Sequence, residues 1–155
     1  MNKWVRFMDM RSGGGLKEPY AYIYIEALCE DDAITIFYNR FGHSPHRVTC
    51  TCCGEDYGVD DGDSLADISA YERGCDYAYF RPDGTECPKD EGWITGKGIA
   101  EGYSAKYVER KGKYRKHVTL GEYLKDSRVL VIRATDIQES ERQGTVPDQG
   151  YIYHE

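Results

Sequence analysis

Aromatic and apolar residues alternate through residues 20–26, and this pattern limits the possible folds more than any other in the chain. Three tyrosines, Tyr20, Tyr22 and Tyr24, fall on one side of an extended backbone, and the isoleucines between them fall on the other. A period of two residues predicts a β-strand. We expect the isoleucine side to face the core, whereas the tyrosine side forms either a second buried layer or an exposed stacking surface.

The segments around this strand predict how the chain continues. Residues 4–10 alternate as a first strand, and residues 30–41 have apolar side chains at helical spacing after three acidic residues. Gly42 ends that helix, and residues 47–51 form a further strand. The order ββαβ predicts an α+β fold in which two to three helices pack on a mainly antiparallel sheet.

The length and charge of the chain restrict its class. At 155 residues the chain fits one domain with its own core, which we predict over residues 1–137, followed by a polar tail over residues 138–155. No apolar run is long enough to cross a membrane, and charges occupy the positions of a signal-peptide core. A net charge of −7 disfavours broad nucleic-acid binding. We therefore expect a cytoplasmic protein.

The densest local chemistry is the segment TCTCCGEDY at residues 49–57. Cys50 and Cys53, followed by Gly54, have the spacing of a zinc knuckle, in which the glycine lets backbone amides turn toward the thiolates. A structural zinc needs two further ligands. The candidate ligands are Cys50, Cys53, Cys75 and Cys87, with His43 and His46 as alternatives. A redox pair, a cysteine nucleophile with a histidine base, and small buried thiols in a tight turn stay open.

Two charged groups and one aromatic group are candidate binding surfaces. Residues 56–63 are acidic and interrupted by glycine, which favours a solvated loop. A partner could be contacted by the acidic residues Asp56, Asp60, Asp61 and Asp63 and by the tyrosines Tyr20, Tyr22 and Tyr24. A basic hairpin tip next to Tyr107 and Tyr114 is typical of a nucleic-acid or acidic-partner surface. Its residues are Lys111, Lys113, Arg115 and Lys116.

Several of these segments together resemble a family of small proteins encoded by tailed bacteriophages. The resemblance is carried by the triple glycine at residues 13–15 and by residues 22–27, 48–57, 70–75 and 118–137. The cysteine-rich segment VTCTCCGEDY is its most specific part. The resemblance implies a viral accessory protein that works in the bacterial cytoplasm, and it transfers no catalytic residue and no substrate. Many such proteins are non-enzymatic inhibitors of host defences, CRISPR effectors among them.

These observations lead to three functional hypotheses. The first is a non-enzymatic phage accessory protein that binds and inhibits a host or defence protein, with anti-CRISPR inhibition as one form. Its acidic residues would then occupy a nucleic-acid channel by imitating phosphates. The second is a sponge-like protein that sequesters a nucleotide signal, with tyrosines stacking on the base. The third is a small zinc-stabilised binding module. We expect no membrane partner. We expect nucleic acid as a partner only if it binds through the basic hairpin.

Overall fold

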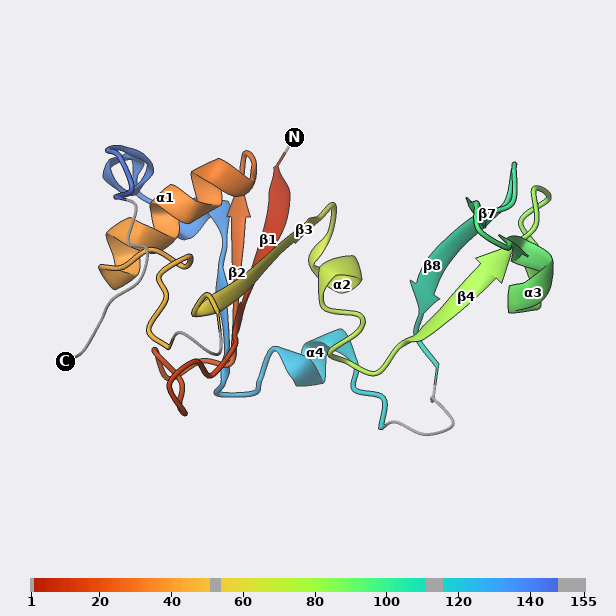
Figure 1. Cartoon of the computed structure of the whole chain (residues 1–155), viewed down its shortest axis with the longest axis horizontal. Helices are drawn as coiled ribbons and strands as arrows, with labels where there is room; N and C mark the ends of the chain where they lie inside the picture. The colour runs from red at the N-terminus through yellow and green to blue at the C-terminus, as the bar shows by residue number, and fades with distance from the viewer. Residues whose placement is uncertain (1, 51–53, 111–115, 148–155) are drawn as a thin grey trace. The chain divides into compact units, whose positions relative to one another are not determined.

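The alternating strand of the sequence is β2 (Tyr22–Ala27), which lies inside a four-stranded sheet (Figure 1). The computed structural model describes residues 2–50, 54–110 and 116–147. The strand order is β3-β1-β2-β9, with β1 antiparallel to both β2 and β3 and with β9 parallel to β2. The flanking strands are β1 (Lys3–Asp9), β3 (Tyr57–Gly62) and β9 (Val129–Ile132).

Helix α1 (Glu30–Phe41) covers one face of this sheet (Figure 1). Its apolar residues meet the isoleucine side of β2 and the inward residues of β1, and the rings of Phe7 and Phe37 lie 4.8 Å apart. Burying side chains of this size stabilises the fold by about 1.5–3 kcal/mol each. Gly42 ends the helix with φ +81° and donates its N–H to the Tyr38 carbonyl, which is the αL ending expected of glycine.

The opposite face of β2 forms a second buried layer. Tyr24 has no exposed surface, and its hydroxyl lies 2.8 Å from the hydroxyl of Tyr123 in α4 (Leu120–Tyr123). The ring of Tyr22 lies 6.3 Å from the Tyr123 ring. A buried tyrosine generally needs a hydrogen-bond partner for its hydroxyl, and here two tyrosines meet that need for each other.

The chain divides into two compact units. Unit 1 comprises residues 1–68 and 121–155, and unit 2 comprises residues 69–120. Unit 2 contains an antiparallel three-stranded sheet in the order β5-β4-β8 and the hairpin β6-β7. Its elements are β4 (Asp76–Phe80), β5 (Glu86–Cys87), α3 (Lys89–Gly92), β6 (Trp93–Ile94), β7 (Gly98–Ile99) and β8 (Ser104–Val108).

The predicted α+β class, the antiparallel pairing and the ββαβ opening are confirmed, but the third strand lies elsewhere. The described part of residues 47–51 makes only single bridges, such as Cys50 with Gly54. Tyr57–Gly62, within the predicted acidic loop, forms β3 instead. β3 is an edge strand, where acidic side chains can point into solvent and discourage pairing with other chains. The pairing with β1 therefore prevails over the low strand propensity of aspartate and glycine.

Short helical segments complete unit 1. These are α2 (Leu65–Ile68), η1 (Ala134–Asp136) and η2 (Glu139–Arg142). η2 belongs to the polar C-terminal stretch and is bonded to α1. Arg40 donates to both carboxylate oxygens of Glu141, at 2.9 and 2.8 Å, and Arg142 pairs with Asp32.

Candidate partner-binding surface

A group of aromatic side chains gathers on one side of the unit 2 sheet. Tyr77 and Tyr79 alternate along β4 and therefore point to the same side. Tyr107 lies opposite Tyr77 on β8. The Tyr77 ring is 4.9 Å from the Tyr107 ring and 5.5 Å from the Tyr79 ring. Aromatic pairs across antiparallel strands stabilise a sheet, so strand pairing places these rings together.

A glycine extends this aromatic group onto the β6-β7 hairpin. A Cβ atom at Gly92 would lie 2.8 Å from the Cβ of Tyr79, so only glycine lets α3 end against that side chain. Trp93 follows directly, with its ring edge-on to Tyr79 at 6.5 Å, and it pairs with Ile99 across the hairpin. We call Tyr77, Tyr79, Trp93, Ile99 and Tyr107 the aromatic face.

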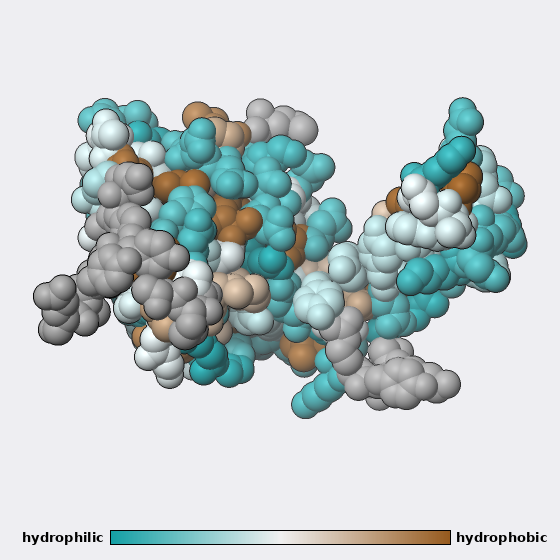
Figure 2. Space-filling model, in the orientation of Figure 1, coloured by the Kyte–Doolittle hydropathy of each residue, from teal (hydrophilic) through white to brown (hydrophobic). Residues whose placement is uncertain are grey.

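Most of the exposed large apolar side chains of the described residues belong to unit 2. Tyr77 is 51% exposed and Trp93 is 45% exposed, which leaves their rings open to a partner. Figure 2 shows brown apolar atoms at the β7 end of this unit. Clustered exposed apolar groups mark interaction sites, and tryptophan, tyrosine and arginine dominate binding energies. The unit 2 residues in this class are Tyr71, Tyr77, Trp93, Ile94 and Ile99.

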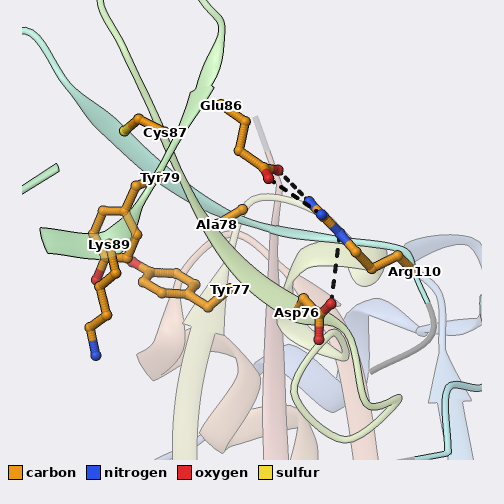
Figure 3. Close-up of a pocket in the computed structure, with 8 residues that line it drawn as sticks. All are labelled: Asp76, Tyr77, Ala78, Tyr79, Glu86, Cys87, Lys89 and Arg110. Carbon is orange, nitrogen blue, oxygen red and sulfur yellow. Dashed lines mark hydrogen bonds and ion pairs between the residues drawn. The ribbon is translucent and has the colours of Figure 1, made fainter. Parts of the chain in front are cut away.

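A pocket of about 290 Å³ adjoins the aromatic face (Figure 3). It is lined by Asp76, Tyr77, Ala78, Tyr79, Glu86, Cys87, Lys89 and Arg110, all from unit 2. Tyr77 and Tyr79 point to one side of β4 together with Lys89, whereas Arg110 and Glu86 lie on the other side. The pocket therefore offers stacking rings and charged groups within one small space.

Arginine sets the electrostatics of the charged side. Arg110 pairs with the Glu86 carboxylate through two nitrogens and lies 3.7 Å from the Asp76 carboxylate. The hydrogen bond from Arg110 lowers the pKa of Glu86, because it stabilises the ionised carboxylate. Burial raises the pKa of the Cys87 thiol, with a further contribution from Glu91. The thiol form is therefore favoured at Cys87, which disfavours a nucleophilic role for this residue.

A buried arginine fixes the strands that carry the pocket. The side chain of Arg73 is 1% exposed, and it donates to the Ser69 hydroxyl at 3.0 Å and to the Glu109 carboxylate at 2.6 Å. The backbone N–H of Val118 donates to the Arg73 carbonyl at 2.8 Å. Arg73 thus joins the entry to β4 with the exit from β8, the two ends of the strand pair that carry the pocket residues Asp76 and Arg110.

The four predicted zinc ligands are not seen together. Cys50 belongs to unit 1, Cys75 and Cys87 are buried in unit 2, and Cys53 lies outside the described residues. The alternative ligands His43 and His46 have their rings on the carboxylates of Glu18 and Glu55. In the described ranges, no group of three or more potential ligands could hold a metal ion. Structural zinc therefore stays a prediction.

The acidic residues predicted to contact a partner differ in their surroundings. The structure removes Asp56 from that set, because its side chain is fully buried and bonded to Arg47 at 2.9 Å and to the Thr49 hydroxyl at 2.8 Å. This carboxylate anchors the cysteine-rich segment instead. Asp60 pairs with Arg6, and Asp63 pairs with Lys3. Asp60, Asp61 and Asp63 are exposed.

The structure describes all three tyrosines of the predicted tyrosine surface but only one of the four residues of the basic hairpin. Tyr24 is fully buried and therefore offers no ring to a partner, while Tyr20 and Tyr22 are half-buried. Among the basic residues, Lys116 is exposed, and Lys111, Lys113 and Arg115 lie outside the described residues. The aromatic face of unit 2 was not among the predicted sites. The alternation of Tyr77 and Tyr79 within residues 75–80 is the sequence signal that could have indicated it.

Comparison with known proteins gives no family for this chain: no family model, curated protein or solved structure matches it. The resemblance to phage accessory proteins therefore stays a prediction. Among the described residues, no helix has both the length and the apolar character needed to span a bilayer.

Proposed function

We propose that this chain is a non-enzymatic binding protein that engages a partner protein through the aromatic face of unit 2. The observation that carries the proposal is the gathering of exposed Tyr77, Trp93 and Ile99 beside a charged pocket. Interfaces of this composition bury aromatic anchors at their centre and keep charged groups at the rim. Following the resemblance, we further propose that the partner is a host or defence protein of a bacterium, met in the cytoplasm. Anti-CRISPR inhibition is one form of this activity.

Affinity capture with matched variants tests this proposal. The full chain and a Tyr77→Ala/Trp93→Ala variant are used as bait in infected bacterial cells, followed by mass spectrometry. The control is Leu28→Ala in unit 1, because Leu28 is the most exposed large apolar residue described, at 63%. We expect the original chain and the control to recover one stoichiometric protein, and the double variant to lose it. Recovery of no such protein, or equal recovery by the double variant, would contradict the proposal.

The lining of the pocket supports a second candidate, a protein that sequesters a nucleotide. Tyr77 could stack on a base, because its ring is exposed, while Lys89 or Arg110 holds phosphate. Thermal denaturation against a panel of nucleotides tests this candidate. A ligand present at a hundred times its Kd stabilises the folded protein by about 2.7 kcal/mol. If no nucleotide of the panel raises the melting temperature, this candidate is eliminated.

A further inference from the structure

The pocket of unit 2 carries more positive than negative charge. Its lining contains the carboxylates of Asp76 and Glu86 and the cations of Lys89 and Arg110. Lys106 adds a third cation from β8, where it pairs across the strands with a residue of the lining and stands over the ring of a phenylalanine of β4. Three cations therefore accompany two carboxylates, and this balance favours an anionic ligand.

Lys89 is the cation of the lining that stays available to a ligand. Both carboxylates contact Arg110, Asp76 at 3.7 Å and Glu86 through two nitrogens. Among the described residues, the ammonium of Lys89 has no ion-pair or hydrogen-bond partner, and its side chain is exposed. Asp90 follows it in α3 but is not part of the pocket lining. Lys89 can therefore hold one anionic group without breaking an existing pair.

The edge of β4 next to this lysine supplies a hydrogen-bond donor and an acceptor. The Arg81 N–H donates to the Thr85 carbonyl at 2.7 Å. Because the backbone groups of every second residue point to the same neighbouring strand, Tyr77 and Tyr79 also direct theirs to the β5 side. Tyr79 pairs there with Cys87, where β5 ends and the chain continues into α3. In the part of the chain that the structure describes, the N–H and C=O of Tyr77 thus have no strand partner.

The side chain of Tyr77 completes the set. Its ring is 51% exposed and lies on the same side of β4 as Lys89 (Figure 3). Tyr79, which is buried, supports it edge-on at 5.5 Å. Proteins read an isolated base by stacking on its face and by hydrogen bonds to its edge, where a donor and an acceptor lie side by side. Tyr77 offers both kinds of contact.

We propose that the pocket binds a nucleoside monophosphate, with its base at Tyr77 and its phosphate on the ammonium of Lys89. This inference rests on the second candidate function, the sequestering of a nucleotide, and specifies the ligand. The pocket volume of about 290 Å³ is at the lower end of small-molecule sites, which favours one base and one phosphate over a dinucleotide. Further phosphates would meet the carboxylates of Asp76 and Glu86 and no second unpaired cation of the described lining.

Isothermal titration calorimetry of the full chain with the common ribonucleosides, their monophosphates and their triphosphates tests the inference. We expect at least one monophosphate to bind about tenfold more tightly than its nucleoside, because a hydrogen bond to a charged group is gained. The triphosphate should bind no more tightly than the monophosphate.

Two variants assign the contacts. Lys89→Gln should weaken the monophosphate about tenfold and leave the nucleoside unchanged, whereas Tyr77→Ala should weaken both ligands equally, since both carry the base. Lys97→Gln is the matched control, because Lys97 is exposed on the same unit and outside the pocket lining, and it should bind like the original chain. Circular dichroism of each variant verifies that it folds.

The outcomes separate this inference from the functions proposed above. Tighter binding of a triphosphate, or an unchanged monophosphate affinity in Lys89→Gln, would overturn the inference and leave the nucleotide candidate in place. Binding of no monophosphate would also overturn it. The proposed engagement of a partner protein is decided separately, by the capture experiment with Tyr77→Ala/Trp93→Ala.

Discussion

A single buried carboxylate, that of Asp56, holds Arg47 and Thr49 in place. The Asp56 carboxylate is fully buried and accepts hydrogen bonds from Arg47, from the Thr49 hydroxyl and from the Thr49 N–H. Asp56→Asn removes the charge that compensates Arg47 and should lower the free energy of unfolding by about 3 kcal/mol. Urea denaturation measures this change. Asp61→Asn, on the exposed side of β3, is the control and should behave like the original chain.

Tyr57 carries a polar group that its surroundings do not satisfy. The residue is 1% exposed and packs against Phe37 with ring centroids 5.0 Å apart, and its hydroxyl has no hydrogen-bond partner among the described residues. An unsatisfied buried hydroxyl costs about 1–3 kcal/mol. Tyr57→Phe should therefore raise the free energy of unfolding at pH 7 by about 1 kcal/mol. A loss of stability in urea would show that the hydroxyl is bonded.

The same tyrosine should make the fold sensitive to alkali. Burial raises the pKa of Tyr57 above its usual value near 10, and the carboxylates of Asp9 and Glu18 raise it further. As the pH rises, the unfolded chain loses the Tyr57 proton before the folded chain does. The stabilisation that comes from this difference in pKa is therefore complete below pH 10 and is lost as the pH rises toward the folded pKa. At pH 11 the difference between Tyr57→Phe and the original chain should exceed that at pH 8 by about 1 kcal/mol. A constant difference would contradict this.

At this scale the sequence shows which residues share a side of a strand but not whether that side is covered. Tyr24 and Tyr77 both belong to alternating tyrosine strands, yet the first is fully buried and the second is half exposed. The difference arises because α4 brings Tyr123 onto Tyr24. Asp56 and Asp60 differ for a similar reason, since the surroundings of Asp56 include Arg47, nine residues away in the sequence.

At the scale of elements, Gly74 controls the close approach of two segments. Its φ is +76°, and an added Cβ would lie 2.7 Å from the Lys116 carbonyl oxygen. Gly84 has a similar φ of +89° with no atom within 4 Å of such a Cβ. Both Gly→Ala variants incur backbone strain of about 1 kcal/mol. Gly74→Ala should be less stable than Gly84→Ala by a further 1–3 kcal/mol, roughly the cost of overpacking. Equal melting temperatures of the two variants would contradict the close approach of Gly74 to the Lys116 carbonyl.

The contact between η2 and α1 should respond to acid. Arg40 lowers the pKa of Glu141 by a two-nitrogen hydrogen bond. Glu141 therefore contributes to the free energy of unfolding above its unfolded pKa, near 4.3. This contribution is lost as the pH falls through the lower folded pKa. Between pH 5 and pH 2 the original chain should lose about 0.5–1 kcal/mol that Glu141→Gln does not lose. Parallel acid titrations of both proteins, followed by circular dichroism, would show identical curves if the contact is absent.

Elements with strong periodicity could be predicted, and those defined by pairing could not. The helix at Glu30–Phe41 has the predicted bounds because apolar spacing and Gly42 both specify it. β3 could not be recognised, since its aspartates and glycines carry no strand signal and it forms by pairing with β1. Two-residue strands such as β5 exist only through their partners. The pocket depends on such a short strand, which is why the sequence does not indicate it.

At the scale of the whole molecule, the two units differ in their cores. Unit 1 buries Val5, Phe7, Ile23, Ile25 and several α1 side chains completely, whereas the buried apolar residues of unit 2 include two alanines and two cysteines. Small cores give low local stability. Hydrogen exchange should therefore be at least tenfold faster in β4 and β8 than in β1 and β2. Equal protection of both sheets would show that the units unfold together.

The parallel pairing of β9 with β2 has a consequence for the synthesis of the protein. Tyr22–Ile25 lie beside Val129–Ile132, so more than a hundred residues, including all of unit 2, separate the two strands along the chain. A ribosome translates the helix and three strands of this sheet before unit 2, and it translates the fourth strand, β9, only after unit 2. The nascent chain therefore carries an unfinished sheet with β2 at its edge throughout the translation of unit 2. Strand β9 is the piece whose arrival completes the sheet.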